Sequence, residues 1–206
     1  MLPDDDLYYT INKQAQAETK VKGSRFIARA FLVANHDETQ ARLTEIRKQE
    51  HSATHNCFAW RLGLGENITF KYSDDGEPSG TAGKPIYDLV EGNKLTNILV
   101  VVTRYFGGTK LGTGGLVRAY SDATRQALHA AGRRENFVMT RLNIEIEFSF
   151  YDQLVKLINR HKASIVESLF SDRVKLSVDI RKSKSKQIRS AIVELTGNRV
   201  EIETIS

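Results

Sequence analysis

The segment from Ile98 to Ala131 constrains the fold of this chain more than any other. It begins with five consecutive apolar residues, Ile98 to Val102, which predict a strand buried on both faces. Five glycines then occupy nine positions, 107–115. Such a loop is expected where the backbone needs positive φ or lies close against another group. Apolar residues then recur at spacings of three and four up to Ala131, which predicts a helix that Gly132 ends.

This strand, glycine-rich loop and helix together predict a site for an anion. The free backbone N–H groups and the dipole of a helix N-terminus both favour negative charge there. Thr113 is a candidate cap for this helix, and the basic residues Arg104, Lys110 and Arg118 flank the glycines.

A second loop, residues 73–85, carries three carboxylates, Asp74, Asp75 and Glu77, among glycines. Clustered carboxylates bind Mg²⁺ or act as acid and base, which makes these residues a candidate metal or acidic site. The alternative is a solvated turn in which Asp and Gly serve only turn geometry. Long loops without secondary structure are often functional, so both interpretations stay open.

We expect the two loops to meet at one edge of a sheet, with cations and carboxylates on opposite sides. An alternative makes Arg104 an internal, structural ion-pair partner of Asp74 or Asp75. The residues predicted to bind phosphate or nucleic acid are Lys84, Arg104, Lys110, Gly112, Gly114, Gly115 and Arg118.

Composition limits the class of protein. The chain has 206 residues, enough for one large or two ordinary domains, and its hydrophobic and charged fractions are those of a globular protein. A net charge of +5 is compatible with a phosphate-bearing partner. Cys57 is the only cysteine, which excludes an intramolecular disulfide and a cysteine-based zinc site, and its apolar neighbours predict a core residue.

Several functions are not indicated. No apolar run approaches the roughly 20 residues of a membrane span. The N-terminus is acidic where a signal peptide would be basic, so we expect a cytoplasmic protein. No nucleophile elbow, Walker loop or dinucleotide fingerprint occurs, so no catalytic residue, metal or cofactor is assigned. The oligomeric state stays open.

The order of predicted elements gives an α+β protein of two domains. We expect an N-terminal extension at 1–19, a first domain at 20–132 and a second at 137–206. The first domain contains predicted strands at 20–33, 57–62, 69–72 and 98–103. It also contains a helix with Asp37 as candidate N-cap, which runs to about Gln49, and a short helix led by Pro85. The second domain follows the order βαββαβ, which is typical of a ferredoxin-like sandwich.

A basic cluster opens the last predicted helix, 183–195. It consists of Arg181, Lys182, Lys184, Lys186 and Arg189. Cations oppose the dipole at a helix N-terminus, so local stability does not explain them. They form either a solvated face or a second surface for phosphates. The strands of this domain lack paired aromatic residues, so no base-reading platform is expected there.

Four segments resemble the signature blocks of the YigZ/IMPACT family, and together they cover most of residues 20–130. They are 22–27 (Lys-Gly-Ser-Arg-Phe-Ile), 55–60 (His-Asn-Cys-Phe-Ala-Trp), 72–85 and 102–120. The resemblance implies a first domain folded like the second domain of small-subunit ribosomal protein five and domain IV of elongation factor G. It implies a ferredoxin-like second domain similar to domain V of that factor.

The resemblance also implies a translation-associated protein with RNA or the ribosome as partner. Eukaryotic members of the family restrain a stress kinase that acts on translation initiation, which adds a regulatory protein as a candidate partner. The competing hypothesis is a Mg²⁺-dependent enzyme acting on a phosphorylated small molecule or nucleotide, because the implied first fold is shared with small-molecule kinases.

Overall fold

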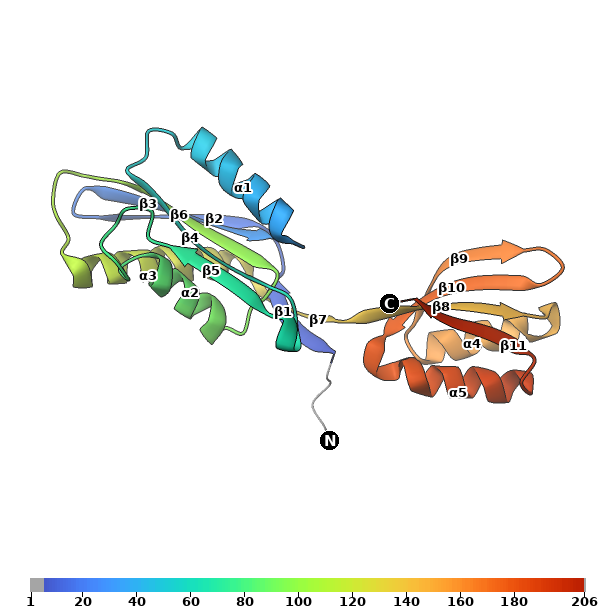
Figure 1. Cartoon of the computed structure of the whole chain (residues 1–206). Helices are drawn as coiled ribbons and strands as arrows, with labels where there is room; N and C mark the ends of the chain where they lie inside the picture. Colours follow the sequence, from blue (N-terminus) through green and yellow to red (C-terminus); the bar gives the residue numbers. More distant parts are fainter. Residues whose placement is uncertain (1–5, 206) are drawn as a thin grey trace. The chain divides into compact units, whose positions relative to one another are not determined.

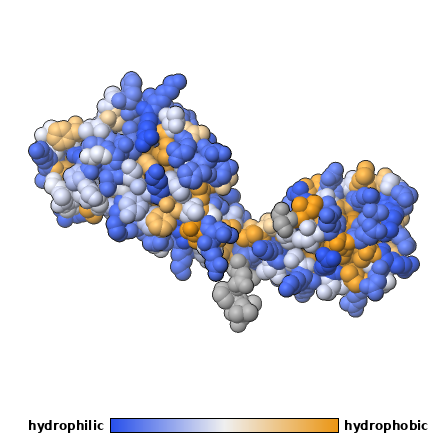
Figure 2. All heavy atoms as spheres, viewed as in Figure 1, coloured by the Kyte–Doolittle hydropathy of each residue, from blue (hydrophilic) through white to orange (hydrophobic). Residues whose placement is uncertain are grey.

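The computed structural model describes residues 6–205, so most of the acidic N-terminal segment lies outside the described residues. The chain divides into two compact units (Figure 1). One comprises Tyr8–Asn136, and the other comprises the described residues of the ranges Met1–Leu7 and Phe137–Ser206. On the side drawn in Figure 2 the surface of each unit is mainly hydrophilic, with apolar side chains in smaller patches.

The N-terminal unit is built on a five-stranded antiparallel sheet with the order β2-β3-β6-β4-β5. Its strands are β2 (Ala15–Val21), β3 (Ser24–Leu32), β4 (His55–Leu62), β5 (Thr69–Ser73) and β6 (Ile98–Tyr105). The central position of β6 explains its continuous apolar sequence, because alternate residues enter different cores. Val100 and Val102 belong to one core, whereas Leu99 and Val101 belong to the other.

Helices cover both faces of this sheet (Figure 1). α2 (Gly83–Gly92) and α3 (Thr113–Ala131) contribute to the larger core, and α1 (His36–Gln49) contributes to the smaller core. The prediction that Asp37 is the N-cap of α1 was wrong, because Asn35, two residues earlier, is the N-cap and accepts a hydrogen bond from the Glu38 amide. The predicted end of α3 at Gly132, with φ of 66°, is confirmed.

Two strands of this unit were not expected. β2 forms an edge of the large sheet although its apolar residues are mostly alanine. β7 (Arg133–Phe137) replaces the irregular boundary expected at 132–136 and pairs with β1 (Leu7–Ile11) in a two-stranded sheet. Both sequences are rich in polar residues, so pairing with a neighbouring strand, not intrinsic propensity, fixes their conformation.

The C-terminal unit has the predicted element order βαββαβ. Its elements are β8 (Met139–Ile146), α4 (Tyr151–Arg160), β9 (Ser164–Phe170), β10 (Val174–Arg181), α5 (Ser185–Thr196) and β11 (Val200–Ile205). The sheet is antiparallel in the order β11-β8-β10-β9. Leucine and isoleucine side chains of α4 and α5 share one core with the strands. α5 ends at Gly197, whose backbone is left-handed.

Three short 3-10 helices complete the described chain: η1 (Gly65–Asn67), η2 (Phe148–Phe150) and η3 (Lys182–Lys184). No helix among residues 6–205 has the length and apolar character needed to cross a membrane.

Candidate functional site

A buried ion pair joins the two loops that the sequence singles out. Arg104, near the end of β6, donates from its Nη1 to Glu77 Oε1 at 2.7 Å, and both side chains are buried. The hydroxyl of Tyr120 on α3 donates to the same carboxylate oxygen at 2.8 Å. The 73–85 loop therefore meets the end of β6, from which the glycine-rich loop leads, but the expected separation of cations from carboxylates was wrong, because Arg104 pairs directly with Glu77. The internal ion-pair alternative was right in kind but wrong in partner, which is Glu77.

The guanidinium of Arg104 is enclosed by protein groups. It lies over the rings of Phe26 and Phe106, with 5.5 Å from Cζ to each centroid, and its Nη2 is 3.4 Å from Ser24 Oγ. The expectation that Arg104 offers its charge to a ligand does not agree with this environment. Its role in the structure is to hold the glycine-rich loop against the 73–85 loop.

The carboxylate of Asp74 closes the N-terminus of α2. Its Oδ1 accepts hydrogen bonds from the amides of Ala82 (2.9 Å) and Gly83 (2.8 Å), and its Oδ2 accepts one from Gly80 (2.9 Å). Negative charge at a helix N-terminus is favourable. Asp74 therefore stabilises its own loop and the helix that follows.

Asp75 has a different set of protein partners. Its Oδ2 accepts a hydrogen bond from the Asn56 amide at 2.7 Å, and its Oδ1 lies 3.7 Å from Arg47. The Nδ1 atom of His55 is 2.8 Å from the Asp75 carbonyl oxygen. Asp74, Asp75 and Glu77 thus face separate donors. Across residues 6–205 no group of three or more His, Cys, Asp and Glu side chains is arranged to hold a metal ion.

Cys57 and Tyr120 lie beneath these loops. The Cys57 thiol is 3.0 Å from the Asp74 carbonyl oxygen and 3.3 Å from the Tyr120 hydroxyl. Burial raises the pKa of the Cys57 thiol far above its ordinary value. Burial, and then the nearby Cys57 and Glu77, raise the pKa of Tyr120 in the same way. Both groups stay protonated, and the prediction that Cys57 is a core residue is confirmed.

The N-terminus of α3, in contrast, is open. Its N-cap is Gly112, with φ of 71°, and no side chain caps it. Thr113 is the first helical residue, so the prediction that Thr113 is the cap was wrong. Leu116 donates its amide to Gly112 O, but the amides of residues 113–115 have no acceptor recorded in the described part of the chain. We call these three amides with Gly112 the α3 mouth.

The structure explains why most positions of the glycine-rich loop, residues 107–115, that carry glycine require it. A Cβ on Gly107 would lie 1.8 Å from the Gly23 carbonyl carbon, and Gly108 has φ of 86°. A Cβ on Gly115 would lie 3.0 Å from Leu111 Cβ. Gly114 differs, because its φ is not positive and a Cβ there would meet nothing within 4 Å. The fold does not explain glycine at position 114.

The remaining predicted cations are solvent-exposed. Lys84 is paired with Asp88 on its own helix, with Nζ and Oδ2 2.7 Å apart. Lys110 and Arg118 are exposed beside the α3 mouth in the sequence, and among the described residues neither has a recorded ion-pair partner. Of the predicted phosphate-binding side chains, these two offer unneutralised charge.

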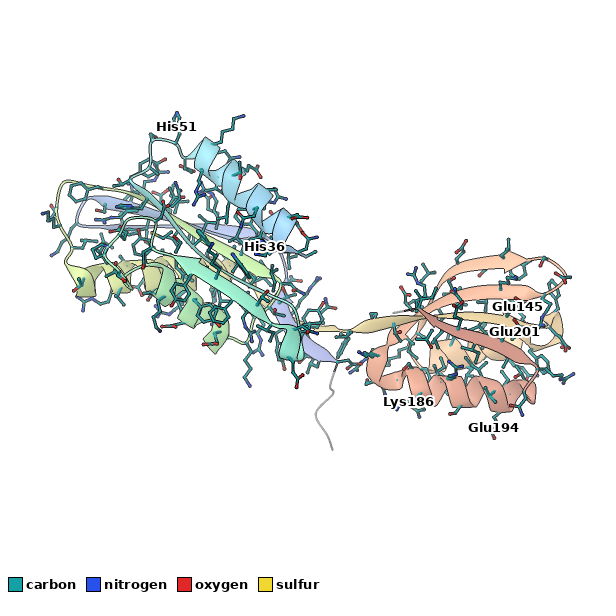
Figure 3. The ribbon with its side chains drawn as sticks, viewed as in Figure 1. His36, His51, Glu145, Lys186, Glu194 and Glu201 are labelled. Carbon is teal, nitrogen blue, oxygen red and sulfur yellow. The ribbon has the colours of Figure 1, made fainter. Side chains whose placement is uncertain are left out.

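The basic cluster of the C-terminal unit separates into two groups. Arg181 donates to Asp6 Oδ1 at 2.8 Å and lies over the Phe137 ring, and Arg189 donates to Ile202 O. The lysines of the cluster are exposed, as Lys186 on the outer side of α5 shows (Figure 3). Those lysines are Lys182, Lys184 and Lys186.

The structure adds residues that the sequence reasoning did not select. Ser24 is fully buried and its Oγ accepts the Gly107 amide at 3.2 Å, which fixes the start of the glycine-rich loop. Tyr120 and His55 contact Glu77. Ser24 and His55 lie in two of the four segments that resemble the family blocks, and that resemblance was the available signal.

Comparison with known proteins agrees with the resemblance of these four segments. The family model described as the Impact N-terminal domain matches residues 22–128. The IMPACT family member YvyE of Bacillus subtilis is 32% identical over 196 residues, covering 95% of this chain and 90% of the relative. The IMPACT family member YigZ of Escherichia coli is 29% identical, covering 90% of this chain and 92% of the relative.

A solved structure is also similar to this chain in its fold. A crystal structure described as that of a hypothetical protein is 27% identical and has a TM-score of 0.66. The match covers 98% of each chain, so both units take part in the similarity.

Proposed function

The chain belongs to the IMPACT family, and we propose that it is a translation-associated regulatory protein that binds the phosphate backbone of structured RNA or of the ribosome. The proposed binding surface is the α3 mouth together with Lys110 and Arg118. Backbone amides at a helix N-terminus and flexible cations are the groups that bind phosphate without reading sequence.

Gly114 is the observation that carries this proposal. Glycine within a helix costs roughly 0.5–1 kcal/mol relative to alanine. At position 114 neither positive φ nor a close neighbour compensates for that cost. A requirement for close approach of a ligand to the backbone would explain the glycine.

The contrast between two helix N-termini of one unit supports the same assignment. Asp74 supplies a carboxylate to α2, whereas no side chain caps α3. An anion from outside the chain would do for α3 what Asp74 does for α2. Lys182, Lys184 and Lys186 are proposed as a second phosphate-binding surface on the C-terminal unit.

The proposal includes the domain likenesses implied by the family. In it the N-terminal unit corresponds to domain IV of elongation factor G and to the second domain of small-subunit ribosomal protein five. The βαββαβ unit corresponds to the ferredoxin-like domain V. The alternative of a Mg²⁺-dependent enzyme has no support from the carboxylates, because Asp74, Asp75 and Glu77 each have protein donors.

Co-sedimentation of the full chain with purified ribosomes tests the proposal. The bound fraction is measured at salt concentrations from about 50 to 200 mM, over which phosphate contacts weaken steeply. The double variant Lys110→Glu/Arg118→Glu is expected to bind less and to reduce the slope of log affinity against log salt by about 2. The matched control is Lys13→Glu/Lys48→Glu, which changes two exposed lysines of the same unit. Salt-independent binding, or equal losses in both double variants, would contradict the proposal.

A further inference from the structure

We propose that β5 binds an extended segment of a partner protein in which an acidic residue stands between two apolar residues. This surface is separate from the α3 mouth and does not depend on the function proposed above.

The first observation is an open backbone edge. β5 is the last strand of the five-stranded sheet and pairs only with β4, from Thr69 opposite Leu62 to Ser73 opposite Phe58. Among the described residues, no backbone hydrogen bond beyond the pairing with β4 is recorded for Thr69 to Tyr72. Another strand supplies alternating donors and acceptors at the spacing that such an edge presents.

The second observation is a pair of exposed aromatic rings on this edge. Phe70 and Tyr72 are 51% and 40% exposed, and their alternation places them on the same face of β5. Both rings contact Tyr87 of α2, with centroid distances of 4.5 Å and 5.8 Å. Tyr87 is buried and its hydroxyl donates to Glu91 at 2.8 Å. The exposed rings therefore rest on a fixed support, which limits the entropy lost when they bind a partner.

The third observation is the charge of Lys71, which stands between Phe70 and Tyr72 in the sequence. Lys71 is exposed on the opposite face of β5, in register with Trp60, and the described chain provides no recorded carboxylate partner for it. Antiparallel pairing of two copies over all five residues of β5 would place Lys71 opposite Lys71. Like charges directly opposite are destabilising, whereas opposite charges stabilise a cross-strand pair.

These observations select one occupant. The open edge favours a strand, the rings favour apolar residues opposite Phe70 and Tyr72, and Lys71 favours an acidic residue between them. The same lysine disfavours a second copy of this chain.

Selection of random heptapeptides displayed on phage, using the immobilised full chain, tests the proposal. Enriched peptides are expected to share an acidic residue with apolar residues on both sides. Their affinity, measured by fluorescence anisotropy with the synthesised peptides, should fall at least tenfold for Phe70→Ala/Tyr72→Ala. The matched control is Phe106→Ala, which removes a ring that is 48% exposed outside β5 and should leave the affinity unchanged.

Two further variants test strand addition and charge selection. In a peptide bound as a strand, only every second amide faces β5. N-methylation of that set should abolish binding, whereas N-methylation of the other set should not. Lys71→Glu should weaken binding of the acidic peptides and strengthen binding of the same peptides with lysine in place of the acid. Failure to enrich any peptide, enrichment without this pattern, or indifference to the β5 variants would overturn the proposal. So would ring-dependent binding of single-stranded RNA in place of peptides.

Discussion

The Arg104 guanidinium and the Glu77 carboxylate are 2.7 Å apart and buried, and they join the end of β6 to the 73–85 loop across 27 positions of the sequence. Tyr120 adds a hydrogen bond from α3 to the same carboxylate. One acidic side chain therefore connects β6, the 73–85 loop and the helix behind the α3 mouth. The glycine-rich loop begins directly after this connection, so its position depends on it.

Removal of either partner should be strongly destabilising. Breaking a buried ion pair leaves an uncompensated charge and costs roughly 3–5 kcal/mol. We expect Arg104→Met and Glu77→Gln each to lower the free energy of unfolding, measured with urea, by amounts of this order. The double variant should lose clearly less than the sum of the two single losses. Additive losses would show that the two side chains do not stabilise the fold as a pair.

Gly107 should tolerate no side chain. A Cβ there would lie 1.8 Å from the Gly23 carbonyl carbon and 2.2 Å from the Ser24 amide nitrogen, both backbone atoms. Gly107→Ala is therefore expected to lower the free energy of unfolding by about 3 kcal/mol or more, because overpacking against backbone is not relieved by a rotamer change. Gly108→Ala, where a Cβ meets only open space, should lose less despite its positive φ. A loss at Gly107 no larger than that at Gly108 would show that the contacts with Gly23 and Ser24 do not exclude a side chain there.

Cys57 should be unreactive in the folded protein. Its side chain is fully buried, and burial raises its pKa far above the ordinary range, so the thiolate that reacts with iodoacetamide is not formed. We expect no alkylation at pH 8 in native buffer, measured by mass spectrometry, and complete alkylation in urea. Rapid labelling of the native chain would show that the 73–85 loop opens over Cys57.

The sequence predicted those elements whose own residues determine them. The apolar run of β6, the periodic α3 and its end at Gly132 were all identified. β2 and β7 were missed because their pairing, not their composition, makes them strands. The meeting of the two loops followed from the topology. The buried state of Arg104 did not, because the sequence gives no signal for which of Asp74, Asp75 and Glu77 turns inward.

Asp6 should make stability depend on pH in acid. Burial raises the pKa of its carboxyl, but hydrogen bonds from Arg181 and Ser183 outweigh burial and lower it from 3.8 to about 2. Because the pKa of Asp6 is lower in the folded chain than in the unfolded chain, the ionised carboxylate stabilises the fold at pH values above the unfolded pKa. This stabilisation is lost as the pH falls through the folded pKa. We expect Asp6→Asn to cost about 1.5–3 kcal/mol near neutral pH. The difference from the parent chain should shrink between pH 3.8 and about 2, measured by urea unfolding at each pH. A difference that stays constant over this range would exclude the ionised carboxylate as its source.

Substitutions of Gly114 should change the stability of the chain and its binding to ribosomes in opposite directions. A Cβ there meets open space, so Gly114→Glu should fold, and replacing glycine in a helix gains roughly 0.5–1 kcal/mol. Negative charge in the first turn adds about 0.3–1 kcal/mol through the helix dipole. The same carboxylate would occupy or repel the place of a phosphate at the α3 mouth. We therefore expect a more stable protein that co-sediments with ribosomes at least tenfold more weakly.

The companion variant is Gly114→Ala, which should gain the helix propensity without the charge. It should weaken binding less than Gly114→Glu does, because its methyl group hinders close approach of a phosphate to the backbone but does not repel it. Thermal unfolding and co-sedimentation of the three proteins at one salt concentration give both quantities. A stabilised Gly114→Glu variant with parental affinity would exclude the α3 mouth as the phosphate site. Parental affinity in Gly114→Ala would show that close approach of a ligand does not explain the glycine at this position.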